Sequence, residues 1–228
     1  MGEVFREAVG LIINLDRELL GITLNSIRFS LISTFLTSLL SIPAGIILAF
    51  RKKERTRVLV SILNTLMAIP TVVVGLLVYT IISRSGPLGT LGLLFTPRAI
   101  IIGQTVLAFP IVTSLVYGAV YGIEQELRET LVTLGCSKAQ LVWKTLLEAR
   151  VAIASAVLSA FGRLIGEVGV SMMLGGNIRN YTRTMTTALA LETQRGAFSL
   201  ALAIGILLLV VAFSVNFALN WTVHRAAR

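Results

Sequence analysis

Five long apolar runs dominate the chain and predict membrane-spanning helices. A helix needs about 20 mostly apolar residues to cross the hydrocarbon core of a bilayer. The runs cover residues 29–50, 58–83, 99–122, 151–174 and 198–223. Three of them contain an internal proline, at Pro43, Pro70 and Pro110, and proline removes a backbone hydrogen bond and bends a helix. The pattern predicts an all-α transmembrane bundle of five spans, organised as a single domain over residues 1–228.

The segment before the first run, residues 1–28, is apolar only in part. It carries the charged residues Arg6, Glu7, Asp16, Arg17 and Glu18. Placing these charges in hydrocarbon would cost several kcal/mol. The segment is therefore expected to form an amphipathic helix that lies in the membrane interface.

Basic residues predict the orientation of the spans. The connection 51–57 contains five cations, Arg51, Lys52, Lys53, Arg55 and Arg57, and short basic loops favour the cytoplasmic side. Alternation then places residues 124–149 and the C-terminus in the cytoplasm, and the N-terminus and residues 177–197 outside. The expected location is the cell membrane, crossed several times.

Composition supports a membrane protein and excludes several other classes. Of the 228 residues, 55% are hydrophobic and 14% charged, with a mean hydropathy of +0.87, which excludes both a soluble globular domain and a disordered chain. The net charge of +9 is explained mostly by membrane topology, so we expect no nucleic-acid partner. The single cysteine, Cys136, and single histidine, His224, exclude a disulfide framework and a Cys- or His-based metal site. We expect no cofactor.

The fourth run has a face of very small side chains. Ser155, Ser159, Gly162, Gly166 and Gly169 recur at spacings of three or four residues. Such a face lets a neighbouring helix approach closely within lipid.

The same run contains two charged residues, Arg163 and Glu167, four positions apart. Residues at this spacing are neighbours on a helix, and each alone would cost about 2.5–3.5 kcal/mol near the bilayer centre. The two are expected to pair and to face protein or water. Two interpretations stay open, a structural ion pair and a part of a transport pathway.

Residues 124–149 form a connection that is too long for a simple turn. Residues 124–134 favour a helix, and Gly135 is suited to end it. Ser137 and Gln140 have the spacing of a capping box that starts a second helix over residues 138–147. A helical hairpin outside the membrane would either dock a soluble partner or be a surface feature without a partner.

The hairpin sequence carries a family resemblance. Residues 129–135, Glu-Thr-Leu-Val-Thr-Leu-Gly, resemble the EAA loop of binding-protein-dependent ABC-transporter permeases, with the glycine six residues after the glutamate. Thr130 and Leu131 stand where the family has two alanines, and Glu148 stands where it has proline. Residues 162–178 and the stretch Thr-Arg-Thr-Met-Thr-Thr at 182–187 resemble the oxyanion branch of these permeases, which carries sulfate, molybdate or tungstate. The tungstate type is the most similar.

The resemblance implies a fold and a set of partners. It implies the type I ABC importer fold, a homodimer that encloses a pore, two cytoplasmic ABC ATPase subunits, and an extracytoplasmic oxyanion-binding protein. It also implies that each permease presents the EAA loop to an ATPase as a coupling helix. Six residues of this chain would then lie at the ATPase contact: Glu129, Thr130, Leu131, Gly135, Cys136 and Ser137.

A segment rich in hydrogen-bond donors follows the fourth run. It contains Asn177, Arg179, Asn180, Tyr181, Thr182, Arg183, Thr184, Thr186 and Thr187. Backbone and side-chain donors are the groups that bind tetrahedral oxyanions. The candidates for the substrate pathway or for contact with the binding protein are Arg163, Glu167, Asn177, Arg179, Thr182, Arg183 and Thr184. The alternative is a solvated loop.

The sequence contains no Gly-Lys pair, so it cannot supply the phosphate-binding loop of an ATPase. We therefore expect a permease and not an enzyme, with ATP hydrolysed by a separate subunit.

The leading hypothesis is an ATP-driven importer of a tetrahedral oxyanion, with tungstate as the expected anion and molybdate or sulfate as alternatives. A channel or scaffold without ATPase coupling is a competing hypothesis. An intramembrane enzyme that uses Arg163 and Glu167 is another, disfavoured because no span contains histidine.

Overall fold

The computed structural model describes residues 2–14, 17–51 and 53–226, and this part of the chain is almost entirely helical. The elements are α1 (Gly2–Ile13), α2 (Arg17–Ala49), α3 (Lys53–Met67), α4 (Thr71–Ile82), the 3-10 turn η1 (Gly89–Leu91), α5 (Pro97–Thr133), α6 (Lys138–Ile165), α7 (Gly169–Gly175), α8 (Met185–Gln194) and α9 (Phe198–Ala226). Four of them, α2, α5, α6 and α9, are long and apolar enough to cross a membrane, and the bent pair α3–α4 makes up to five crossings.

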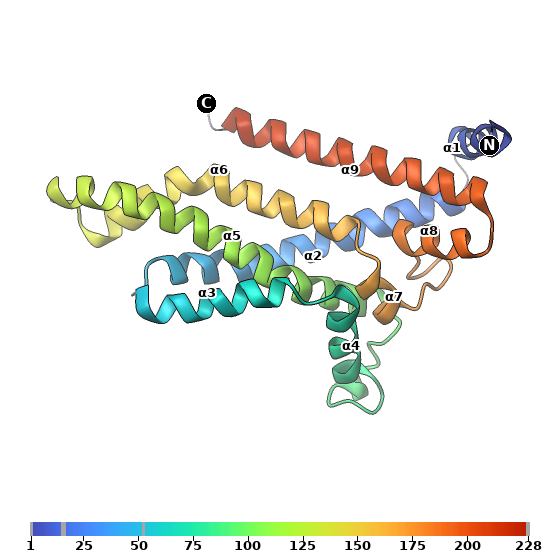
Figure 1. Cartoon of the computed structure of the whole chain (residues 1–228), viewed down its shortest axis with the longest axis horizontal. Helices are drawn as coiled ribbons and strands as arrows, with labels where there is room; N and C mark the ends of the chain where they lie inside the picture. The colour runs from blue at the N-terminus through green and yellow to red at the C-terminus, as the bar shows by residue number, and fades with distance from the viewer. Residues whose placement is uncertain (1, 15–16, 52, 227–228) are drawn as a thin grey trace.

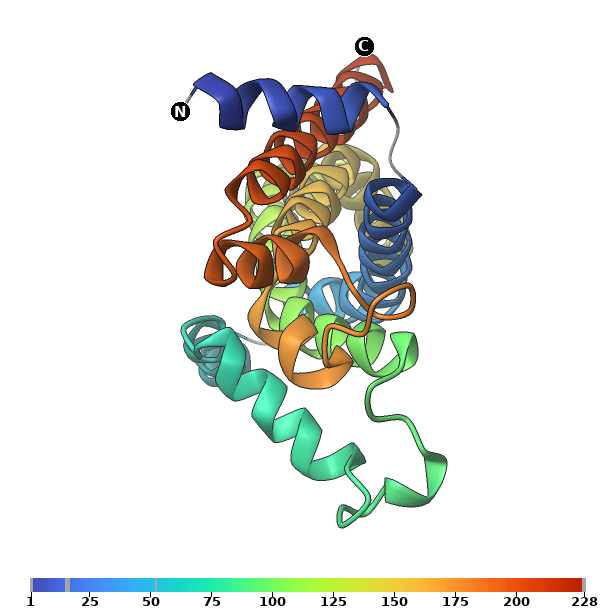
Figure 2. The same ribbon diagram turned by 90° about the vertical axis from the view of Figure 1, so that its right-hand side faces the viewer.

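The long helices lie side by side in one bundle (Figure 1). The connections α2–α3 and α5–α6 lie at one end, which we call the hairpin end after residues 134–137. Helix α8 and the first residues of α2 lie at the other end, which we call the α8 end. Helix α1 crosses over α9 there (Figure 2). The predicted all-α bundle is therefore observed, but several predicted helices differ in their limits.

The second apolar run, residues 58–83, does not form the predicted single span. It bends by 100° between residues 56–67 and 71–82. Pro70 precedes α4 with an extended ψ of 135°, and it has no N–H group with which to continue the hydrogen bonding of α3. Helix α4 therefore leaves the bundle direction and packs against α7.

The fourth apolar run, residues 151–174, is also broken. Helix α6 ends at Ile165, and the short α7 begins at Gly169, because glycine at 166 and 169 weakens the helix between them. The predicted face of small residues is thus divided. A Cβ added at Gly162 would lie 3.2 Å from Asn216 Nδ2 of α9, whereas one at Gly169 would lie 2.6 Å from Thr71 Oγ1 of α4.

The first 28 residues do not form one interfacial helix. Helix α1 ends at Ile13, and α2 begins at Arg17 and runs on to Ala49. Leu19 and Ile22 of α2 are buried and contact α1, α8 and α9 side chains in one apolar cluster. The predicted limit at residue 28 was wrong because the charges at 17 and 18 lie at the end of a long helix, outside its apolar part. A separate N-terminal helix is present as α1, and its place in the membrane interface stays a prediction.

The predicted hairpin of residues 124–149 is present, but its helices are not separate elements. Helix α5 continues from the apolar run to Thr133, and α6 continues from Lys138 to Ile165. No proline lies between Pro110 of α5 and the end of α6 at Ile165. The hairpin is therefore a rigid extension of two spanning helices, and only residues 134–137 are non-helical.

Helices α2 and α5 pack closely through small and polar side chains. Ser33 Oγ donates to Gln104 Oε1 at 2.8 Å, and Ser41 Oγ donates to the carbonyl of Phe109 at 3.1 Å. At Gly45 of α2, an added Cβ would lie 2.8 Å from Val116 Cβ and 2.9 Å from the carbonyl oxygen of Thr113. Glycine at this position therefore sets the distance between the two helices.

Replacing Gly45 with leucine is expected to destabilise the bundle by about 1–3 kcal/mol, because the side chain has no space between α2 and α5. The measurement is thermal unfolding of the purified protein in detergent. Gly21→Leu on the same helix is the matched control, since nothing lies within 4 Å of its added Cβ. Equal melting temperatures for the two variants would contradict the close approach at Gly45.

Candidate functional site: the helical hairpin and the α8 end

The tip of the α5–α6 hairpin is built by two local motifs. Gly135 has φ +76°, and the N–H of Cys136 donates to the carbonyl of Leu131 at 3.0 Å, which closes α5 with a Schellman-type turn. Ser137 then caps α6. Its backbone N–H donates to Gln140 Oε1 at 2.8 Å, and its hydroxyl accepts from the Gln140 N–H at 3.3 Å. The predicted roles of Gly135 and Ser137 in shaping the tip are confirmed.

The surface of the hairpin exposes large apolar side chains. Leu134 is 72% exposed and Trp143 is 63% exposed, and Leu147 is also exposed. Thr130 is exposed, whereas Leu131 and Cys136 are half-buried. The backbone of Glu129 lies in α5, but its side chain lies outside the described residues. Apolar groups gathered on a polar extension mark a surface that a partner can cover.

The break between α6 and α7 is organised by Glu167, whose side chain is only 2% exposed. Its carboxylate accepts from Arg163 Nη1 at 2.9 Å and from the backbone N–H of Val170 at 3.2 Å. Its backbone carbonyl accepts from Thr186 Oγ1 at 2.8 Å. The predicted ion pair therefore forms, and Glu167 joins the end of α6, the start of α7 and the start of α8.

The donor-rich segment directs several of its polar groups inward. Thr182 Oγ1 donates to the Gly175 carbonyl at 2.5 Å and accepts from the Ile178 N–H at 3.0 Å. Asn177 Nδ2 donates to the carbonyl of Thr187 at 3.3 Å. Thr184 caps α8 and exchanges hydrogen bonds with Thr187. These donors hold the segment and α8 in place, while residues 178–181 remain exposed.

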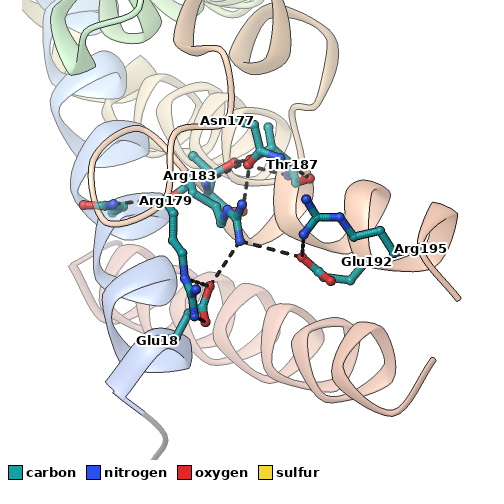
Figure 3. A network of polar contacts seen from close by, with 9 residues as sticks. Glu18, Asn177, Arg179, Arg183, Thr187, Glu192 and Arg195 are labelled. Atoms are coloured by element: carbon teal, nitrogen blue, oxygen red, sulfur yellow. Dashed lines mark hydrogen bonds and ion pairs between the residues drawn. The ribbon is translucent and has the colours of Figure 1, made fainter. Parts of the chain in front are cut away.

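Arg179 and Arg183 both contact Glu18 at the start of α2 (Figure 3). Arg179 Nε lies 2.9 Å from Glu18 Oε1, and its Nη2 contacts Oε2 of the same carboxylate. Arg183 Nη1 lies 3.1 Å from Glu18 Oε1 and 3.7 Å from Glu192 Oε1. Arg195 Nη1 lies 3.3 Å from Glu192 Oε1. We call these five residues the arginine–glutamate network.

The members of this network differ in burial. The side chain of Arg183 is 9% exposed and that of Glu192 is 8% exposed, whereas the side chain of Arg179 is 66% exposed. Three arginines and two glutamates leave one net positive charge. The network joins the start of α2, the 177–184 segment and α8, so its first effect is to fix the α8 end of the molecule.

Sequence reasoning missed both glutamates of the network and helix α8. One local signal was available for α8, because threonine is a favoured N-cap residue and Thr184 occupies that position. No local signal pairs Glu18 with Arg183, which lies 165 positions away. Within the described residues, no group of three His, Cys, Asp or Glu side chains is arranged to hold a metal ion.

Comparison with known proteins agrees with this architecture. Residues 41–228 match the family described as binding-protein-dependent transport system inner membrane component. The chain is 39% identical to a tungstate uptake system permease of Campylobacter jejuni over 225 residues, covering 93% of this chain and 89% of that protein. It is 39% identical to a probable anion ABC transporter permease of Haloferax volcanii, covering 87% and 88%.

Two more distant matches are a molybdenum transport permease and a solved transporter structure. A molybdenum transport permease of Mycobacterium tuberculosis is 26% identical, covering 82% of this chain and 73% of that protein. A chain of the inward-facing MetNI methionine ABC transporter superposes with a TM-score of 0.76 at 20% identity, covering 94% of this chain and 99% of that chain. The superposition confirms the predicted importer-permease fold. The chain therefore belongs to the family of binding-protein-dependent transport system inner membrane components, as a permease of the oxyanion branch that most resembles the tungstate type.

Proposed function

We propose that this chain is the membrane-spanning subunit of an ATP-driven importer that carries tungstate. The identity of 39% to a tungstate uptake permease, against 26% to a molybdenum permease, supports tungstate over molybdate. In this proposal the chain performs no chemistry. A separate ATPase hydrolyses the nucleotide, and an extracytoplasmic binding protein delivers the anion.

The observation that carries the proposal is the hairpin of α5 and α6. It continues two spanning helices without interruption and ends in a tip with exposed Leu134 and, on the following helix, exposed Trp143. We propose that an ATPase subunit covers this tip through residues 129–137. Because α5 and α6 are continuous, movement of the tip would be transmitted along rigid helices into the membrane.

The proposed orientation places the hairpin end in the cytoplasm, with the N-terminus outside. The α2–α3 connection and the hairpin lie at the same end of the bundle (Figure 1), and Arg51 at the end of α2 belongs to the basic group of residues 51–57. The rule that short basic loops stay inside supports this orientation.

We further propose that two copies of the chain form the pore. Helix α4 projects from the bundle (Figures 1 and 2) and exposes Val72, Val73, Leu76, Leu77 and Ile81. A second copy would cover these apolar side chains.

At the α8 end, the exposed residues 178–181 are proposed to contact the binding protein. Arg163 is 44% exposed and remains a proposed residue of the pathway, held in position by Glu167. The contacts of Arg179, Arg183, Thr182 and Thr184 support a role in shaping this end. We propose that these four residues affect the anion indirectly, because they hold residues 177–184 in position.

Uptake of labelled tungstate tests the proposed function. Cells that lack this chain are expected to lose tungstate uptake by about tenfold or more, and restoring the chain should restore uptake. Molybdate or sulfate in excess should compete only weakly. A tenfold preference for tungstate over either anion corresponds to a difference in binding free energy of only about 1.4 kcal/mol. If molybdate or sulfate competes as well as tungstate itself, the assignment of tungstate is wrong. Uptake that persists without the chain would reject the transport role altogether.

A further inference from the structure

A cleft at the α8 end is not used by the proposed transport function. It has a volume of about 360 Å³ and lies between α2, the amino-terminal turn of α5 and the segment around residues 91–97. Its lining includes Arg28 and Arg98 together with apolar side chains, and it includes no aspartate or glutamate. The lining of the cleft therefore combines two positive charges with apolar side chains.

The two arginines occupy equivalent positions on neighbouring helices. Arg28 directly precedes the apolar run of α2, and Arg98 directly precedes the apolar run of α5. Both are exposed, and neither forms a salt bridge with a residue that the structure describes. Arg98 also lies in the first turn of a 37-residue helix, where the helix dipole adds positive potential. Two uncompensated cations therefore lie at the same membrane boundary.

Each helix also adds an apolar side chain about one turn further into its apolar run. Ile32 lies four positions after Arg28, and Ile101 lies three positions after Arg98, and both line the cleft. These spacings place the arginine and the isoleucine on one face of each helix. The cleft thus has a cationic rim at the level of lipid headgroups and an apolar wall below it. A free inorganic anion would use only the rim.

We propose that this cleft binds an anionic phospholipid, with the phosphate held between Arg28 and Arg98 and an acyl chain along Ile32 and Ile101. Arginine suits a phosphate because its planar guanidinium donates two parallel hydrogen bonds. The positive charge of the two arginines also attracts the anionic headgroup at this membrane boundary. Bound there, the lipid would link α2 to the start of α5 at the end opposite the hairpin.

Native mass spectrometry of the full-length permease in detergent tests this site. With phosphatidylglycerol added, the protein is expected to retain the lipid in preference to phosphatidylcholine, and Arg28→Gln combined with Arg98→Gln should lower retention by about tenfold or more. Arg84→Gln is the matched control, since Arg84 is exposed in the same region but lines a different cleft. Arg28→Lys combined with Arg98→Lys keeps both charges and should retain most of the lipid.

Three outcomes would overturn the proposal. Retention of phosphatidylglycerol by the double glutamine variant at the wild-type level would show that the arginines do not hold it. An equal loss in Arg84→Gln would show that only general surface charge matters. Binding of inorganic phosphate or tungstate that depends on Arg28 and Arg98, without retention of phosphatidylglycerol, would assign the cleft to a free oxyanion.

Discussion

Replacing Gly135 with valine is expected to abolish coupling between the permease and its proposed ATPase while leaving the spanning bundle assembled. Gly135 has φ +76°, a conformation that costs an L-residue about 1–2 kcal/mol and a β-branched one more. The turn that closes α5 would therefore rearrange and displace Leu134 and Ser137. We expect co-purification of the ATPase and uptake of tungstate both to fall by about tenfold or more, since tenfold corresponds to only 1.4 kcal/mol.

The matched control for this variant is Gly122→Ala in α5, the helix that Gly135 follows. An added Cβ at Gly122 meets nothing within 4 Å, and its φ is not positive, so the substitution should leave the hairpin unchanged. Membrane insertion of both variants should stay close to the wild type, because Gly135 is exposed and an added Cβ there meets nothing within 4 Å. Full uptake by the Gly135→Val variant would reject the hairpin as the coupling element.

Replacing Arg183 with methionine is expected to have the second largest effect, on the α8 end. Arg183 is nearly buried between Glu18 and Glu192. Removing Arg183 costs about 1.5–3 kcal/mol, as for a hydrogen bond to a charged group, because Glu18 and Glu192 lose one counter-charge but keep Arg179 and Arg195. This loss corresponds to a fall in melting temperature of about 3–12 °C for a domain of this size, measured by thermal unfolding in detergent. Tungstate uptake should fall with it, because the 177–184 segment would no longer be held to α2.

Arg179→Met is the matched control, since Arg179 contacts the same Glu18 carboxylate but is 66% exposed. An exposed ion pair contributes about 0–1 kcal/mol, so this variant should melt close to the wild type. If both arginine variants melt at the same temperature, burial does not decide the strength of the network.

The apolar runs predicted five membrane crossings but not their continuity, since four are single long helices and a fifth requires the bent pair α3–α4. Hydropathy sums side chains over a window and takes no account of the backbone. Pro70 and Gly166 sit inside windows that are apolar enough to span, yet the chain turns by 100° beside Pro70 and α6 ends at Gly166. The two broken runs place α4 and α7 against each other. The amino-acid composition does not predict this arrangement.

The hairpin was the part of the candidate site that the sequence predicted well. Its tip depends on Gly135 and on Ser137 with Gln140, and these residues all lie within five positions of one another. Short-range backbone motifs of this kind are encoded locally. The donor-rich segment was predicted less well, because the same threonines can bind a ligand or build a loop. Only the folded structure shows the hydrogen bonds by which Thr182, Thr186 and Asn177 hold the loop, to the carbonyls of Gly175, Glu167 and Thr187.

What the sequence determined by itself was a helical membrane protein with a capped hairpin, because both follow from the hydrophobicity and hydrogen bonding of residues close together in the chain. The tertiary structure alone decided which charges far apart in the sequence meet. Arg183 reaches Glu18 across 165 positions, and Arg28 shares a cleft with Arg98 because α2 and α5 pack together. Electrostatic interactions depend on distance in space, which the folding of the spans sets and the spacing of residues along the chain does not.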